Sequence, residues 1–182
     1  SNNKGKIREF NALFASRGIE VVAQGTLGVT ECEEPYGTFL ENALAKARNA
    51  ARQTGLPAMA DDSGIIAHAL VTEPGVHSAR YAGVHSDDAA NNAKLVAALK
   101  DKDDKRAAYT CVLVAVRSAD DPDPVVAQAS WCGEIVADPR CSGGFGYDPH
   151  FYLPEFGKTA AELTAEEKNA VSHRGRAMAR ML

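Results

Sequence analysis

Cysteine is scarce in this sequence, and its few copies are not placed for a zinc site. The four cysteines are Cys32, Cys111, Cys132 and Cys141, and no two of them form a CxxC pair. The histidines do not stand at zinc-ligand spacing from them either. We therefore expect free thiols in a reducing compartment, which predicts a cytoplasmic protein.

Long apolar runs and an excess of positive charge are also missing. No apolar run approaches the roughly 20 residues that a membrane-spanning helix needs, and no signal peptide is visible, so we expect no contact with a membrane. The formal net charge is −4, whereas proteins that hold nucleic acid by its phosphates usually carry a basic field. We therefore expect no nucleic-acid partner, and any phosphate site must be a local cluster of Lys and Arg.

The composition and its periodicity predict the class of fold. Of the 182 residues, 45% are hydrophobic and 24% are charged, which suffices for a core without disulfides. Helical patterns alternate with short apolar runs, and Tyr109 to Val116 and Val125 to Ile135 follow as an antiparallel hairpin. This order predicts an α/β fold with a mixed central sheet and flanking helices.

Capping residues mark the ends of the expected helices. Thr38 and Glu41 fit a capping box, as do Thr164 and Glu167, and Gly55 can end the second helix. A short strand is expected at Ile19 to Ala23. The predicted helices are about Lys4 to Gly18, Thr38 to Gln53, Asp87 to Leu99 and Thr164 to Leu182.

Residues Ala60-Asp61-Asp62-Ser63-Gly64 carry the strongest chemical signal. They complete the apolar run that begins at Leu56, which predicts a buried strand that delivers two carboxylates to a turn. Side chains alternate along a strand, so Asp61 and Asp62 should point to opposite sides. Carboxylates in such a place suit Mg²⁺, which prefers oxygen ligands. The alternative is a surface turn, since Asp, Ser and Gly all favour turns.

Basic and acidic groups elsewhere could complete a site for a phosphorylated ligand. Ser1-Asn2-Asn3-Lys4-Gly5-Lys6 precedes a helix, where free amides and two lysines attract an anion, although an ordinary helix start with solvated lysines has the same pattern. Glu34 or Glu41 could join Asp62 in holding a metal, unless Glu41 is only the capping partner. Lys46 is either a phosphate ligand or a surface lysine.

Two further segments suit a purine base. Gly143 to Pro149 combines three glycines with two aromatic rings and an acceptor, Asp148, which favours stacking of a base over a simple turn with one buried aromatic. On the last helix, Lys168 and Ser172 are four residues apart and share a face. With His173 and Arg174 they suit an anion or a carbonyl-bearing base, or form a charged surface. The indole of Trp131 is expected in the core or packed on the hairpin.

Taken in order, these motifs resemble the inosine triphosphatase or Ham1-like family of non-canonical purine nucleoside triphosphate pyrophosphatases. The resemblance covers essentially the whole chain, and the ordered set is much more specific than any single motif. The motifs that carry it are Ser1-Asn2-Asn3-Lys4-Gly5-Lys6, Thr38-Phe39-Leu40-Glu41-Asn42-Ala43, Ala60-Asp61-Asp62-Ser63-Gly64, Pro74-Gly75-Val76, Ser78-Ala79-Arg80-Tyr81-Ala82-Gly83, Gly144-Phe145-Gly146-Tyr147-Asp148-Pro149, Lys158-Thr159-Ala160-Ala161-Glu162-Leu163, Glu167-Lys168-Asn169 and Ser172-His173-Arg174.

The resemblance implies a homodimer with two lobes around a long active-site cleft, and Mg²⁺-dependent hydrolysis of ITP, dITP and XTP to the monophosphate and pyrophosphate. Residues 1–182 would form a single domain of this type, and a first strand would precede Ser1. Asp62 would be the general base and a metal ligand, with Glu34 and less directly Glu41 and Asp61 as further metal ligands. The implied substrate-binding residues are Ser1, Asn2, Asn3, Lys4, Gly5, Lys6, Lys46, Ser63, Phe145, Gly146, Tyr147, Asp148, Lys168, His173 and Arg174.

The chain departs from the family pattern near the aspartate pair. Relatives often have Asp where this chain has His68, and Tyr where it has His77. They have a glycine-rich link where this chain has Val71-Thr72-Glu73. We therefore expect local differences in geometry behind Asp62 and at the dimer contact. Two other readings are a nucleotide sensor without turnover and a general phosphohydrolase that releases orthophosphate without base preference.

Overall fold

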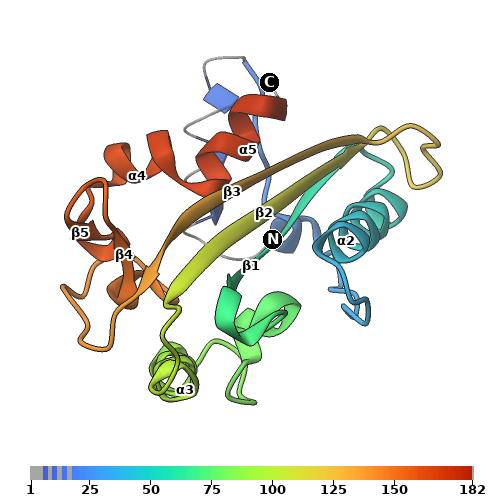
Figure 1. Cartoon of the computed structure of the whole chain (residues 1–182). Coiled ribbons are helices and arrows are strands. Elements are labelled where there is room, and N and C mark those ends of the chain that lie inside the picture. The colour runs from blue at the N-terminus through green and yellow to red at the C-terminus, as the bar shows by residue number, and fades with distance from the viewer. Residues whose placement is uncertain (1–5, 8–9, 12–13, 16–17, 182) are drawn as a thin grey trace. The chain divides into compact units, whose positions relative to one another are not determined.

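Five strands form one sheet and lie in it in chain order, from β1 to β5 (Figure 1). In this computed structural model the described residues are 6–7, 10–11, 14–15 and 18–181. Strand β4 pairs in antiparallel fashion with both β3 and β5. The strands are β1 (Ala58–Ala67), β2 (Arg106–Val116), β3 (Val125–Ile135), β4 (Phe151–Leu153) and β5 (Lys158–Thr159).

From residue 18 to residue 181, four α-helices accompany the sheet, together with short 3₁₀ helices such as Gly75–Arg80. This combination confirms the predicted α/β class. Within the described part of the chain, no helix is both long and apolar enough to cross a membrane. The α-helices are α2 (Phe39–Thr54), α3 (Asp88–Leu99), α4 (Ala165–Val171) and α5 (His173–Met181).

The chain divides into two compact units, and strands β1, β2 and β3 run from one unit into the other. The predicted cleft between two lobes stays a prediction. The first unit consists of Ser1–Asp62, Val112–Gln128 and Ala177–Leu182, and the second of Ser63–Cys111 and Ala129–Arg176.

Helix α2 forms as its sequence predicts. The Thr38 hydroxyl accepts a hydrogen bond from the Glu41 amide at 3.2 Å, and Gly55 ends the helix in the left-handed conformation. Alanines four residues apart share one face of a helix, so a smooth surface results that can approach a strand closely. This face forms the core of the first unit, whose buried members are Ala43, Ala47, Ala51, Val112, Val114 and Val116.

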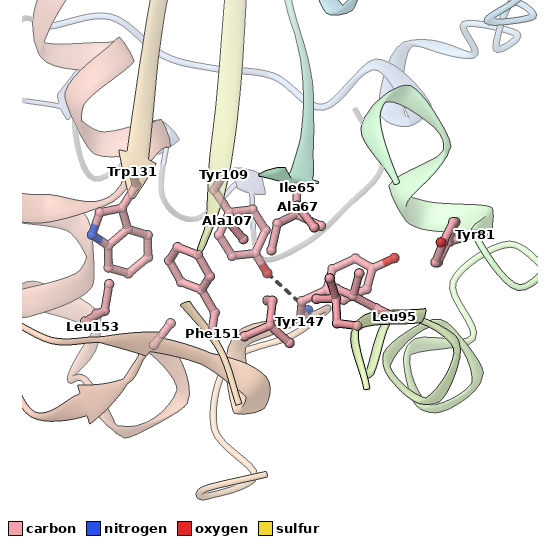
Figure 2. Packing of buried hydrophobic residues seen from close by; sticks show 13 residues of the cluster. Ile65, Ala67, Tyr81, Leu95, Ala107, Tyr109, Trp131, Tyr147, Phe151 and Leu153 are labelled. Atoms are coloured by element: carbon pink, nitrogen blue, oxygen red, sulfur yellow. Dashed lines mark hydrogen bonds between the residues drawn. The ribbon is translucent and has the colours of Figure 1, made fainter. Parts of the chain in front are cut away.

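Aromatic rings dominate the core of the second unit, as Figure 2 shows around Tyr109. The Tyr109 ring meets Phe151 edge to face with centroids 4.8 Å apart, and Trp131 meets Phe151 at 5.3 Å. The Tyr109 hydroxyl accepts a hydrogen bond from the Tyr147 amide at 3.1 Å, drawn as a dashed line. Trp131 is only 1% exposed, which confirms its predicted place in the core.

Strand β1 corrects the prediction of a turn after the aspartate pair. It runs without interruption through Asp61, Asp62 and Ser63 to Ala67. Both carboxylates are buried, at 4% and 7% exposure, so the alternative of a surface turn is also wrong. Asp, Ser and Gly favour turns through local contacts, but pairing with β2 in the sheet outweighs that preference.

Two other predicted elements differ from the structure. Ile19 to Ala23 is not a strand, and its apolar side chains at Ile19 and Val22 are each half exposed. The single last helix is also wrong, because the chain is extended at Ser172, where α4 ends and α5 begins. The Ser172 hydroxyl accepts a hydrogen bond from the Gly175 amide at 3.1 Å and so caps α5. The expected helix from Lys4 to Gly18 falls partly outside the described residues.

Val71 has a backbone conformation that favours glycine. Its φ of 64° lies in the left-handed region, which is unfavourable for a β-branched residue, and its side chain is 80% exposed. We expect Val71→Gly to raise the free energy of unfolding by about 1 kcal/mol, because relief of backbone strain exceeds the entropic cost of glycine.

Denaturant titration measures this effect against a matched control. Val84→Gly removes another exposed valine, at 67% exposure, from a residue that is not among those with positive φ. We expect this control to lose about 0.5–1 kcal/mol. A Val71→Gly variant that is destabilised as much as the control would contradict the assignment of strain to Val71.

Candidate functional site

Both carboxylate oxygens of Asp62 have partners on helix α2. Its Oδ1 lies 2.9 Å from Lys46 Nζ, and its Oδ2 accepts a hydrogen bond from Asn42 Nδ2 at 3.3 Å. Lys46 and Asn42 are four residues apart on α2, so one face of that helix presents both groups to β1. Ser63 follows Asp62 directly in the strand. The structure thus brings the predicted Asp62 and Lys46 together.

The surroundings of Asp62 make it a better proton acceptor than an ordinary aspartate. Burial raises the pKa of Asp62 above its usual range and the charge of Glu34 adds to this, while Lys46 and Asn42 oppose the shift. Burial alone would lower the pKa of the Lys46 ammonium, but the nearby carboxylates, chiefly Asp62, outweigh it and raise this pKa. Lys46 therefore stays charged while Asp62 retains basicity, a combination suited to general base chemistry.

Glu34 joins this group, and Glu41 does not. The Glu34 Oε1 lies 3.3 Å from Lys46 Nζ, so Lys46 is a cation shared by Glu34 and Asp62. The Glu41 carboxylate instead accepts a hydrogen bond from the Thr38 hydroxyl at 2.6 Å, the capping arrangement that was the alternative for this residue. Its role as a metal ligand stays a prediction.

The pair of Asp62 and Glu34 fits a hard divalent cation. Both present oxygen atoms, and the ammonium of Lys46 already marks a place beside them where positive charge is favoured. Among the residues that the structure describes, no group of three His, Cys, Asp or Glu side chains could hold a metal. Mg²⁺ commonly uses only one or two carboxylates and takes its other ligands from water and substrate phosphates. The two carboxylates of Asp62 and Glu34 are therefore enough protein ligands for this ion.

Asp61 points to a different partner, as the alternation of side chains along a strand predicts. Its Oδ2 lies 2.8 Å from Lys6 Nζ, and its side chain is almost fully buried. Lys6 therefore lies beside the aspartate pair, as a phosphate-binding lysine would need. The rest of the predicted phosphate segment, residues 1–5, lies outside the described residues.

A second polar cluster lies in the second unit and is centred on Asp148. Its Oδ2 lies 2.5 Å from Lys168 Nζ and also accepts a hydrogen bond from the Phe145 amide at 3.0 Å. The Tyr109 hydroxyl donates to its Oδ1 at 3.4 Å. A buried carboxylate with this many donors holds the loop in one conformation.

Phe145 is the one ring of the glycine-rich segment that is open to a ligand. It is 39% exposed, with Lys168 Nζ 4.6 Å and Arg174 Cζ 5.7 Å from its centroid. Tyr147 is 4% exposed and donates its hydroxyl proton to the Ser78 carbonyl at 2.7 Å. Tyr147 is therefore the buried aromatic that the alternative reading of this loop expected.

His173 and Arg174 are buried rather than exposed on a charged helix surface. His173 is 5% exposed and stacks on Tyr109 with centroids 4.7 Å apart and planes within 5°. Arg174 is 3% exposed. Both side chains follow the extended residue Ser172, which separates α4 from α5. Phe145, Asp148, Lys168 and Arg174 are thus brought together.

Sequence reasoning missed Asn42 and Tyr109, which hold the predicted residues in place. Asn42 is fully buried, and its amide exchanges hydrogen bonds with both backbone groups of Tyr36 while it donates to Asp62. The available signal for Asn42 was its position one helical turn before Lys46, on the same face of α2. Nothing in the sequence near Tyr109 links it to Asp148 or His173, because these contacts span more than 35 residues.

The glycine-rich loop should tolerate no side chain at Gly144. Its φ is 73°, and a Cβ there would overlap Asp148 Oδ2, whereas Gly157 has a similar φ of 64° with nothing nearby. Gly157→Ala should therefore lower the free energy of unfolding by about 1 kcal/mol, which is the cost of the backbone conformation alone. We expect Gly144→Ala to lose about 2 kcal/mol more in a thermal or denaturant unfolding experiment, because the buried pair of Asp148 and Lys168 must shift. Equal losses would contradict this packing.

Several known proteins are similar to this chain over nearly its whole length. A model of the Ham1 family matches residues 1–182. A dITP/XTP pyrophosphatase of Ralstonia nicotianae is 62% identical, covering 100% of this chain and 92% of the relative, and one of Nitrosomonas europaea is 60% identical, covering 100% and 90%. The structure of a HAM1 protein from Coxiella burnetii has a TM-score of 0.94 at 46% identity, with 99% of this chain and 92% of that chain covered. The Staphylococcus aureus Ham1 protein has a TM-score of 0.87 at 39% identity, with coverage of 99% and 92%.

Proposed function

Because this chain belongs to the Ham1 family, we propose that it hydrolyses the non-canonical purine nucleoside triphosphates ITP, dITP and XTP to the monophosphate and pyrophosphate. Residues 1–182 would act as a single domain of this type. The observation that carries the proposal is the buried Asp62, whose pKa is raised and whose partners are Lys46, which also pairs with Glu34, and Asn42. Relatives near 60% identity that are named dITP/XTP pyrophosphatase support the choice of substrate.

Asp62 is proposed as the general base. Its carboxylate would orient a water molecule for in-line attack on the α-phosphorus and accept the proton of that water. A proton taken by a group with a raised pKa is held more firmly than by an ordinary aspartate, which favours this step. Asn42 keeps the carboxylate in place from α2, since its own orientation is fixed by Tyr36.

Lysines would balance the negative charge of the triphosphate. Lys46 and Lys6 are held beside the two aspartates, and each can turn its ammonium toward a phosphate oxygen once substrate enters. Ser63 and the segment Ser1 to Gly5 are proposed to hold further phosphate oxygens.

Asp62 and Glu34 are proposed to hold Mg²⁺, because they are the carboxylates that share a cation. The metal would supply charge neutralisation for the phosphate oxygens and the leaving pyrophosphate. Glu41 and Asp61 are less favoured as metal ligands in this proposal, because Glu41 accepts a hydrogen bond from Thr38 and Asp61 pairs with Lys6.

The second unit is proposed to recognise the base. Phe145 would stack on the purine, and Lys168, His173 and Arg174 would surround it with donors, while Gly146, Tyr147 and Asp148 shape the loop. Inosine and xanthine carry a carbonyl at position 6, where adenine carries an amine. A donor fixed at that point would be left unpaired by adenine, which discriminates strongly between the two.

We also propose that the enzyme works as a homodimer in the cytoplasm and takes small-molecule nucleotides as its substrates. The family resemblance supports the dimer. All four cysteines are free thiols, which agrees with a reducing compartment.

Steady-state kinetics with dITP, XTP, dATP and dGTP in the presence of Mg²⁺ tests the proposed function. We expect rapid turnover of dITP and XTP to the monophosphate, slow turnover of the other two, and loss of activity on chelation that Mg²⁺ restores. Equal turnover of all four nucleotides with release of orthophosphate would support a general phosphohydrolase. Binding of dITP without turnover would support a nucleotide sensor.

A further inference from the structure

One face of helix α3 holds both backbone groups of Gly146, the residue that follows the exposed Phe145. The Asp88 Oδ2 accepts a hydrogen bond from the Gly146 amide at 2.7 Å, and Asn92 Nδ2 donates to the Gly146 carbonyl at 2.8 Å. Asp88 and Asn92 are four residues apart, so they lie on the same face of α3. This two-point clamp joins segments that are more than 50 residues apart in the chain.

The orientation of Asn92 is fixed by its neighbours. Its Nδ2 also donates to the Asp88 carbonyl at 2.8 Å, so two carbonyl oxygens determine which way the amide faces. The side chain is 8% exposed, and its Oδ1 is buried without a hydrogen-bond partner in the described part of the chain. An unpaired buried acceptor is unfavourable, so stability alone does not account for Asn92.

The clamp and Asp148 together fix Phe145 from both sides. Asp148 accepts a hydrogen bond from the Phe145 amide, and the clamp holds the peptide that follows Phe145. Gly146 has a φ of 62°, and a glycine can adopt many other conformations unless contacts such as these hold it. The position of the Phe145 ring therefore depends on α3.

We propose that Asp88 and Asn92 are positioning residues that set the affinity for the purine base by fixing the loop that carries Phe145. This inference rests on the proposed function, in which Phe145 stacks on the base. Neither residue needs to touch the substrate. A loosened loop should weaken nucleotide binding while Asp62 performs its chemistry as before, so the effect should fall on KM and not on kcat.

Kinetics of three variants with dITP test the proposal. Asp88→Ala should raise KM about tenfold and leave kcat within about twofold. Asp88→Asn keeps an oxygen that can accept from the Gly146 amide, so it should restore KM to within about threefold of wild type. Asp87→Ala is the matched control, because Asp87 caps the same helix by accepting from the Ala90 amide at 3.0 Å and, among the described residues, makes no hydrogen bond to Gly146.

The control separates positioning from simple loss of stability. Asp87→Ala should lower the melting temperature without raising KM. The proposal is overturned if Asp88→Ala leaves KM unchanged, or if Asp87→Ala raises KM as much as Asp88→Ala does.

Amide hydrogen exchange gives a readout that does not depend on turnover. Exchange in residues 143–148 should be faster in Asp88→Ala than in Asp87→Ala. Equal rates would contradict the claim that Asp88 holds this loop. If the wild-type protein fails to hydrolyse dITP, the proposed function fails, while the exchange experiment still decides whether Asp88 holds this loop.

Discussion

Replacing Asp62 by Asn is expected to lower kcat for dITP about a thousandfold, because the proposed general base and a metal ligand are lost together. The amide has nearly the same shape as the carboxylate, and its oxygen can still accept a hydrogen bond from Lys46, so the fold should persist although the bond from Asn42 Nδ2 is lost. Burial raises the pKa of Asp62, which shows that its charge is not favoured by its surroundings. The measurement is steady-state turnover of dITP, with thermal unfolding in parallel.

A surface aspartate provides the control for this change. Asp104→Asn removes a carboxylate that pairs with Arg106 at 2.8 Å in the second unit. We expect wild-type kcat for this variant. Full activity of Asp62→Asn would remove the basis of the proposed mechanism, and so would an equal loss in both variants.

Replacing Arg174 by Met should remove most of the preference for dITP over dATP. Methionine fills a similar volume and is neutral, so it keeps apolar contact while it removes the donors of the guanidinium. A charge-assisted hydrogen bond contributes about 1.5–3 kcal/mol, so kcat/KM for dITP should fall roughly 10- to 150-fold. The value for dATP should change by less than about threefold, because adenine offers no carbonyl to this donor.

Arg176→Met is the matched control on the same helix. Arg176 is exposed, and its guanidinium donates to the Ser130 carbonyl at 3.4 Å. This variant should keep the wild-type ratio of kcat/KM for dITP and dATP. If Arg174→Met also keeps that ratio while dITP is still hydrolysed, another residue reads the base.

Local signals predicted the parts of the site that depend on neighbouring residues. The cap at Thr38 and the stop at Gly55 set the limits of α2, and this places Lys46 one turn after Asn42. Alternation along a strand separated Asp61 from Asp62, and the structure gives them different partners, Lys6 and Lys46. These features follow from helix and strand periodicity, which the sequence shows directly.

The remaining features depend on contacts between distant segments. The turn-forming residues after Asp62 are held in β1 by sheet pairing, which no local pattern reveals. Ser172 breaks the last helix, although a serine inside a helix and a serine at a cap look alike in sequence. The stacking of His173 on Tyr109 and the hold of Asp88 on Gly146 likewise join residues far apart in the chain.

The most direct test of the mechanism is hydrolysis of dITP in water labelled with ¹⁸O, followed by mass spectrometry of the products. Attack on the α-phosphorus by a water molecule activated at Asp62 predicts one labelled oxygen in dIMP and none in the released pyrophosphate. Label in pyrophosphate would show attack on the β-phosphorus, and labelled orthophosphate would show attack on the γ-phosphorus. Either result would contradict the account given for Asp62 and its partners.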